Sequence, residues 1–133
     1  MKSFLFVLII LCSFTAILAQ FADKEIRHRL LGQWSANHTF DEISVSGTSF
    51  FGTDGMAYFD GTIRGIKDVS EYHVSARWHI SGGRVVTQVV ESTIPEIFPL
   101  GATEIDSVVA LNDSIYSYID KNGELLTDKK IPY

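Results

Sequence analysis

The sequence contains a single cysteine, Cys12, which lies in an apolar N-terminal segment and not in the body of the chain. Once this segment is removed, the chain has no disulfide, no thiolate nucleophile and no cysteine-ligated metal. Its fold must then be stabilised by burial alone. This favours a well-packed barrel over a loop-rich scaffold held by disulfides.

Sequence motifs of common enzyme classes are also missing. No Gly-x-Ser-x-Gly sequence presents a serine nucleophile, and no glycine-rich loop leads from a strand into a helix to hold a phosphate. Asp54 and Asp60 both precede a glycine, which is typical of turn residues and not of a catalytic carboxylate pair. We therefore expect a protein that is not an enzyme and has no cofactor.

Positive charge is scarce, because 11 Lys and Arg residues stand against 16 Asp and Glu residues and give a net charge of −5. An acidic surface repels phosphate backbones and anionic headgroups, so we expect neither nucleic acid nor an anionic membrane surface as a partner.

The four histidines are His28, His38, His73 and His79. His73 and His79 share one strand face, but six positions at about 3.3 Å each place them about 20 Å apart, too far to share a metal ion. His38, on a neighbouring strand, stays open as a partner for one of them. We expect solvated surface histidines and no metal site.

The chain begins with an apolar segment. Lys2 precedes an apolar run over residues 4–18, and the small Ala19 follows that run. This order predicts a secretory signal peptide over residues 1–19, cleaved after Ala19. The alternative, an uncleaved anchor, is somewhat short for a span of about 20 apolar residues. We expect a secreted or periplasmic protein without stable membrane insertion after cleavage, and a single β-barrel domain over residues 20–133.

A short helix is predicted over residues 21–31, FADKEIRHRLL. Ala22, Ile26 and Leu30 recur every four residues, as on the apolar face of an amphipathic helix. Gly32 is expected to end it.

After the helix, apolar and polar residues alternate with the period of a half-buried strand. The clearest example is EYHVSARWHI, residues 71–80, where Tyr72, Val74 and Trp78 share the apolar face. Strand candidates span residues 34–40, 43–51, 56–63, 71–80, 84–91, 105–111, 114–120 and 124–131.

The links between these candidates favour β-hairpins. Asp54-Gly55, Gly82-Gly83 and Asn122-Gly123 supply the positive φ angles that tight hairpin turns require, and Asn112-Asp113 is a fourth candidate. Short links make an antiparallel meander. Such strands protect their edges by closing into a barrel or by splitting into two sheets. Continuous hairpins favour the barrel, so we predict an all-β fold: a roughly eight-stranded, antiparallel, up-and-down barrel preceded by a short helix.

One connection, STIPEIFPLGAT (residues 92–103), is long and apolar. Pro95 and Pro99 exclude regular strand pairing. Its apolar residues are Ile94, Ile97, Phe98 and Leu100. We expect a lid over one mouth of the barrel, with a structural plug or a self-association surface as alternatives.

The helix that leads into Gly32-Gln33-Trp34, followed by meandering strands, resembles the lipocalin superfamily. The order LLGQW, FFGTDGMAYFDG, ARWHISGGRVV and SYIDKNGELLTDKKI is most similar to small lipocalin-like domains of secreted bacterial proteins. The resemblance covers nearly the whole chain after the signal peptide.

This resemblance implies a lipocalin-like cup that Trp34 closes at one end, where the helix caps the barrel and a basic residue of the last strand lies over the indole. Lys129 and Lys130 are the two candidates for that basic residue. Lipocalins typically use arginine there, and lysine stacks less well on an aromatic ring. The chain is shorter than a typical transport lipocalin, so its cavity is expected to be small or filled with side chains.

Aromatic side chains are the best indication of a ligand, because a ligand cup is usually apolar with a few convergent hydroxyl groups. The alternative is that they only form the core. Tyr116 and Tyr118 are ambiguous, because Ile115 and Ile119 compete for the inner face. The candidate ligand-binding residues are Tyr58, Tyr72, Trp78, Phe98, Tyr116 and Tyr118.

The sequence thus predicts a secreted or periplasmic, non-catalytic, lipocalin-like protein that binds a small apolar or amphipathic ligand in its barrel. The alternative is an envelope protein-interaction or inhibitor module that uses the barrel as a scaffold and binds through His73, Arg77 and His79 or through residues 94–100. A third alternative is a structural domain without a ligand.

Asn37 and Asn112 begin N-glycosylation sequons, which matter only in a eukaryotic host.

Overall fold

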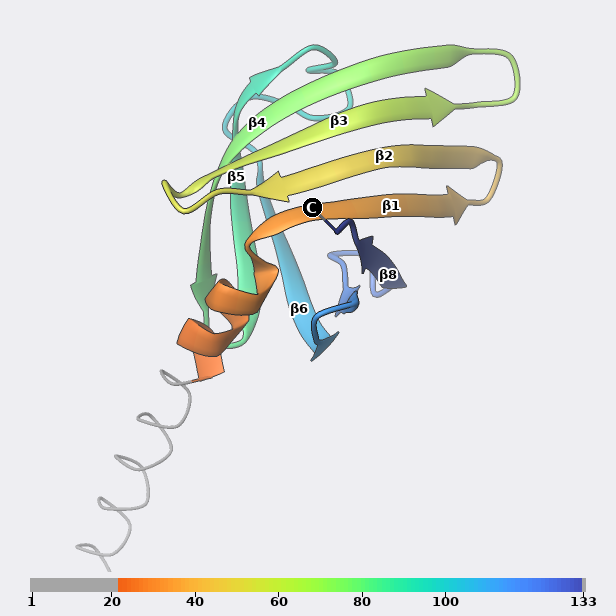
Figure 1. Ribbon diagram of the computed structural model, residues 1–133. Helices are drawn as coiled ribbons and strands as arrows, with labels where there is room; N and C mark the ends of the chain where they lie inside the picture. Colours follow the sequence, from red (N-terminus) through yellow and green to blue (C-terminus); the bar gives the residue numbers. More distant parts are fainter. Residues whose placement is uncertain (1–21, 133) are drawn as a thin grey trace, which may run out of the picture.

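Eight antiparallel strands follow one short helix and close into a barrel in sequence order (Figure 1). The computed structural model describes residues 22–132, so the predicted signal peptide, residues 1–19, lies outside the described residues. The strands are β1 (Gly32–Phe40), β2 (Ile43–Phe51), β3 (Met56–Arg64), β4 (Val69–Ser81), β5 (Arg84–Ser92), β6 (Thr103–Leu111), β7 (Ile115–Ile119) and β8 (Leu125–Lys130). The prediction of an all-β, up-and-down antiparallel barrel is confirmed.

The glycine-containing turns form where the sequence predicts them. Gly55, Gly83 and Gly123 all have positive φ angles at hairpin connections. Asp60 differs from its prediction, because it lies inside β3 and not in a turn. The glycine that follows it, Gly61, is a strand residue paired with Gly47 of β2, so the interpretation of Asp60 as a turn residue is wrong.

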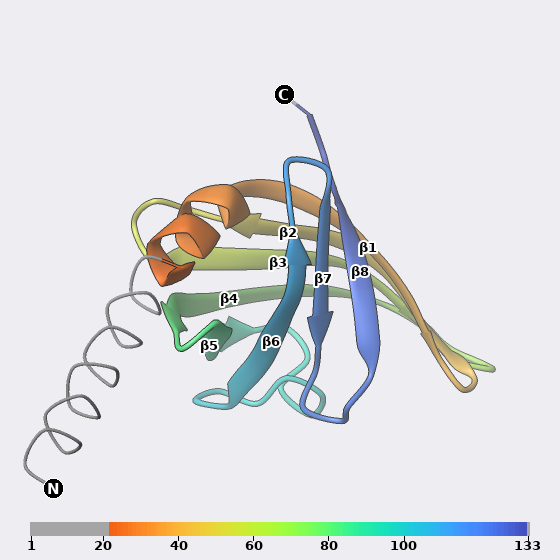
Figure 2. The ribbon, with the colours of Figure 1, turned by 90° about the horizontal axis from the view of Figure 1, so that it is seen from below.

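The helix spans residues 22–30 and lies at one end of the barrel (Figure 2). It ends before Gly32, whose φ of 109° is unfavourable for a residue with a side chain. The Asp23 carboxylate accepts hydrogen bonds from the backbone N–H groups of Gly82 (2.9 Å) and Gly83 (2.7 Å) in the turn between β4 and β5. These bonds attach the helix to that end of the barrel. No helix within the described residues is long and apolar enough to cross a membrane.

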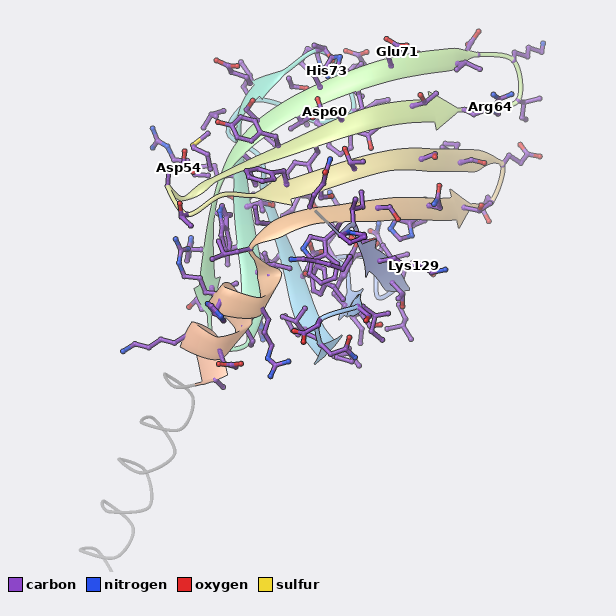
Figure 3. All side chains as sticks on the ribbon, in the orientation of Figure 1. Asp54, Asp60, Arg64, Glu71, His73 and Lys129 are labelled. Carbon is purple, nitrogen blue, oxygen red and sulfur yellow. The ribbon has the colours of Figure 1, made fainter. Side chains whose placement is uncertain are left out.

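Trp34 fills the helix end of the barrel, as predicted, and is fully buried. Its indole N–H donates a hydrogen bond to the carbonyl of Leu30 at 2.8 Å. The ammonium group of Lys130 lies 4.6 Å from the ring centroid and also donates to the carbonyl of Leu31. Lys130 is therefore the basic residue over the indole. Lys129 is exposed, and Figure 3 shows it beside β8 on the outside of the barrel.

Trp78 of β4 is a second buried indole in the same core cluster. Its N–H donates to the carbonyl of Gly52 at 3.1 Å, and its ring lies 5.1 Å from that of Phe51. The guanidinium carbon of Arg27, on the helix, lies 4.5 Å from the Trp78 ring centroid. The helix thus closes this end through cation–π contact as well as through hydrogen bonds.

The barrel closes through a short seam between its first and last strands. β1 and β8 pair only at Trp34 with Lys130 and at Ser35 with Lys129. β1 continues to Phe40, so its second half lies beyond the ladder that it shares with β8. The backbone ladder between β1 and β8 therefore lies at the helix end of the seam and does not extend along the second half of β1.

Candidate ligand-binding cavity

A cavity of about 560 Å³ lies inside the barrel and extends from the Trp34 core toward the opposite end. Its volume is within the range of about 300–1,000 Å³ that is usual for small-molecule sites. At its base lie Phe51, Val85 and Tyr116, which belong to the core cluster around Trp34. The cavity is thus closed below by packed side chains.

One wall of the cavity is apolar and comes from β1 to β5. Alternation along these strands directs every second side chain inward, and the inward residues are mostly aliphatic or aromatic. The aliphatic and aromatic residues that line the cavity here are Ala36, Phe40, Ile43, Val45, Phe51, Phe59, Ile63, Tyr72, Val74, Ala76, Val85 and Val89. His38, Ser49 and Thr87 are the polar residues of the same wall.

The connection between β5 and β6 adds to this wall at the far end. Ile97 and Phe98 both line the cavity, and the Phe98 ring lies 5.9 Å from the ring of Tyr72. The N–H groups of Ile97 and Phe98 donate to the carbonyl of Ile94, at 3.0 and 2.9 Å, and Ile94 is itself buried. Leu100 remains 64% exposed. Part of the loop therefore covers the cavity, as a lid would.

The opposite wall is polar and comes from β6 to β8 and the turn between β7 and β8. The residues that line it are Glu104, Asp106, Tyr116, Tyr118, Asp120, Lys121, Asn122, Leu126 and Asp128. Carboxylates thus face an apolar surface across the cavity, which is unusual because the inner face of an antiparallel barrel is normally apolar throughout.

His38 and Asp128 form a side-chain hydrogen bond between β1 and β8 at the point where their backbone ladder has ended. His38 Nε2 lies 2.8 Å from an Asp128 carboxylate oxygen, and the two side chains are only 10% and 4% exposed. The Tyr118 hydroxyl lies 3.4 Å from the same nitrogen and 3.5 Å from the same oxygen. The expectation that His38 is a solvated surface histidine is wrong, because inward alternation from Trp34 brings it to a buried carboxylate.

Asp106 also lines the cavity, but it has no ion pair or side-chain hydrogen bond among the residues that the structure describes. Burial raises its pKa to about 7, and repulsion from Glu104, Asp120 and Asp128 adds to the shift. Lys121 opposes the shift, but its ammonium group is engaged by Glu104 at 2.8 Å. Asp106 is therefore a carboxyl group that is poised to change charge near neutral pH.

Tyr116 stands at the base of the polar wall. Its ring stacks on Tyr118 at 4.5 Å and meets Trp34 edge-on at 6.0 Å. Its hydroxyl group is buried and, within residues 22–132, has no hydrogen-bond partner. Burial and the carboxylates of Asp106 and Asp128 raise the pKa of this hydroxyl well above its usual range, so it stays protonated.

Four of the six candidate ligand-binding residues line the cavity: Tyr72, Phe98, Tyr116 and Tyr118. The other two do not. Tyr58 is 40% exposed on the outer face, where its ring lies 6.3 Å from Phe50, because its neighbours Ala57 and Phe59 take the inward positions of β3. Trp78 belongs to the closed-end core and lies outside the cavity lining.

Sequence reasoning missed the carboxylates of the polar wall. In β6, Ile105 and Val109 are exposed whereas Asp106 faces inward, and a register shift between Val108 and Ala110 interrupts the alternation. The inward position of Asp128 could have been predicted, because Asp128 lies two residues before Lys130 in β8 and therefore shares its inward face.

The outer face carries a separate histidine pair. His73 of β4 contacts the Asp60 carboxylate of β3 through Nδ1, and Figure 3 shows the two labelled residues near each other on neighbouring strands. Both side chains are largely exposed. No group of three or more metal-binding side chains occurs in the part of the chain that the structure describes.

Comparison of the sequence with known protein families finds no matching family model, and comparison with curated proteins finds no match. The cavity must therefore be interpreted from its own residues.

Proposed function

We propose that this protein is a non-catalytic, lipocalin-like binding protein that holds one small apolar or amphipathic molecule inside its barrel. The observation that carries the proposal is the cavity of about 560 Å³ that opens away from the end filled by Trp34. We also propose that the protein is secreted or periplasmic, on the basis of the predicted signal peptide.

The interior offers an apolar ligand a surface that water solvates poorly. An eight-stranded barrel is just wide enough to be filled by side chains or to hold one small ligand. Here two small residues that line the cavity, Ala36 and Ala76, leave space on the wall formed by β1 to β4. Burial of an apolar ligand in this space would stabilise the complex by about 25 cal/mol per Å² of surface removed from water.

The polar groups of the cavity support binding better than catalysis. His38 Nε2 is engaged by Asp128, and the hydroxyl group beside this pair belongs to Tyr118. Burial raises the pKa of Tyr118 well above its usual range, which makes that hydroxyl a poor nucleophile.

The neutral apolar dye N-phenyl-1-naphthylamine tests the proposal. We expect saturable binding to the wild-type protein with increased dye fluorescence. Ala36→Phe places a large ring in the cavity, so it should weaken dye binding by at least about tenfold, the equivalent of 1.4 kcal/mol.

Thr39→Phe is the matched control, because Thr39 lies on the same strand and is exposed. It should leave dye binding unchanged. Equal dye binding by both folded variants, or no saturable binding by the wild type, would contradict the proposal.

A second candidate function is an interaction module that uses the barrel as a scaffold. Ile97 and Leu100 favour it, because they are 52% and 64% exposed on one loop. The dye experiment separates the two functions, since a protein-binding loop does not require an accessible cavity.

A further inference from the structure

We propose that the ligand is a primary amine with an apolar tail, and that Asp106 and Tyr116 together bind its protonated amino group. The inference rests on the proposed function, because it assigns the ligand class of the same cavity.

Every carboxylate of the cavity lining except Asp106 has a hydrogen-bond or ion-pair partner among the described residues. His38 is paired with Asp128, and Lys121 with Glu104. Asp120, whose carboxylate accepts hydrogen bonds at 2.9 Å from the N–H groups of Asn122 and Glu124, is engaged by its own turn.

Asp106 alone among these carboxylates has no such partner in the described part of the chain. Asp106 is partly buried, and a carboxylate that is partly removed from water without a partner is costly; a ligand cation would remove that cost.

The position of Asp106 also fits an amine that carries an apolar tail. Asp106 pairs with Val85 across the ladder between β5 and β6, so the two side chains share the inner face. Val85 is buried and begins the apolar wall of β5. A molecule whose amino group meets Asp106 can therefore place its tail along the apolar wall.

Tyr116 provides an independent observation. Its hydroxyl group has no hydrogen-bond partner within residues 22–132, although the residue is only 2% exposed and lines the same cavity. Leaving a buried hydroxyl group unsatisfied is costly, because the group has lost its hydrogen bonds to water and gained none in the protein. An ammonium group has three N–H donors, so it can bind a carboxylate and a phenol oxygen at once.

The same groups disfavour an anionic ligand. A carboxylate would be repelled by Asp106 and by Asp120, and the one lysine of the lining is already bound to Glu104. The high pKa of Asp106 describes the cavity without a cation; a bound ammonium would lower it by favouring the charged carboxylate.

Isothermal titration calorimetry with three nine-carbon probes tests the inference: nonylamine, 1-nonanol and nonanoate. At pH 8, above the Asp106 pKa of about 7, wild-type protein should bind nonylamine at least about tenfold more tightly than nonanol, since a hydrogen bond between two charged groups is stronger than one between neutral groups. Nonanoate should bind most weakly.

Asp106→Asn keeps the side-chain shape and removes the charge, so the amine preference should disappear while nonanol still binds. Tyr116→Phe should reduce the preference without abolishing nonanol binding. Glu71→Gln, at an exposed carboxylate on the outside of β4, is the control and should leave the preference unchanged (Figure 3).

Nonanol binding shows that each variant folds. If Asp106→Asn fails to fold, the wild-type protein alone provides the test. Its preference for nonylamine over nonanol should decrease from pH 8 to pH 6 as Asp106 becomes protonated.

Nonanol binding without an amine preference, or a preference that survives in folded Asp106→Asn, would overturn this inference and leave the proposed function intact. Binding of none of the probes would overturn both.

Discussion

At the scale of single residues, the two ends of the barrel differ in how buried polar groups find partners. At the closed end, the Trp34 indole donates to Leu30, and the Lys130 ammonium group donates to Leu31 while it contacts the indole ring. In the cavity, Asp106 and the hydroxyl group of Tyr116 have no comparable partner among the described residues. The polar groups of the closed end are therefore satisfied within the chain, whereas those of the cavity lack partners that the proposed ligand would supply.

Asp106 should make stability depend on pH. Folding raises its pKa from 3.8 to about 7. The folded state thus holds this proton more tightly than the unfolded state, and the stability that the proton contributes at low pH is lost as pH rises through 7. Asp106→Asn has no carboxyl group at this position, so its stability does not decrease in this way. Its free energy of unfolding relative to wild type should increase by about 1–3 kcal/mol between pH 4.5 and pH 8, measured by urea denaturation.

Asp113→Asn is the control for this series, because the Asp113 side chain is 98% exposed. Its difference from wild type should stay constant with pH. A difference for Asp106→Asn that is equally constant would show that Asp106 is not buried in the way the structure describes.

Prediction from sequence succeeded at Trp34 because the resemblance to lipocalins implied a tryptophan at the closed end, where this residue is fully buried. It failed at Tyr58, since β3 lacks a clean alternation and Ala57 and Phe59 take the inward positions. Asp106 was missed altogether, because strand period alone gives no reason to place a carboxylate inside. That side chain is directed inward by pairing with Val85, a long-range contact.

At the scale of elements, two glycines and one tyrosine lie side by side across β2, β3 and β4, and the glycines make room for the tyrosine side chain. Gly47 pairs with Gly61, and Gly61 pairs with Tyr72. A Cβ atom on either glycine would lie 2.8 Å from the Tyr72 hydroxyl oxygen and closer still to backbone. The two strands can therefore approach Tyr72 only because these positions have no side chain.

We expect Gly47→Ala to destabilise the barrel by about 1–3 kcal/mol, the usual cost of overpacking, as measured by urea denaturation. Gly65→Ala is the matched control, since a Cβ there would have only one neighbour, 3.9 Å away. It should change stability by less than about 0.5 kcal/mol. Equal stability of the two variants would contradict the close approach of these strands.

The elements themselves were largely predictable. Alternation and glycine turns located all eight strands, because each is a local property of the sequence. The seam was not predictable. It depends on how β1 and β8 meet over two residue pairs and then on the buried contact between His38 and Asp128.

At the scale of the whole molecule, the barrel has a direction and two unlike walls. The helix lies at one end of the barrel (Figures 1 and 2). Both tryptophans belong to the core cluster at this end, and Phe98, on the connection between β5 and β6, lines the cavity at the other. The strands β1 to β5 supply an apolar wall and β6 to β8 a carboxylate-rich wall. This arrangement is the basis for proposing that the barrel holds an amphipathic small molecule.

The most direct test of this claim is a methyl NMR spectrum of valine- and isoleucine-labelled protein, titrated with 1-nonanol. The account predicts saturable shifts for the cavity methyl groups of Val45, Ile63 and Val89, and none for the exposed methyl groups of Val69 and Val109. Shifts confined to exposed positions, or none that saturate, would contradict the claim that the barrel binds its ligand inside.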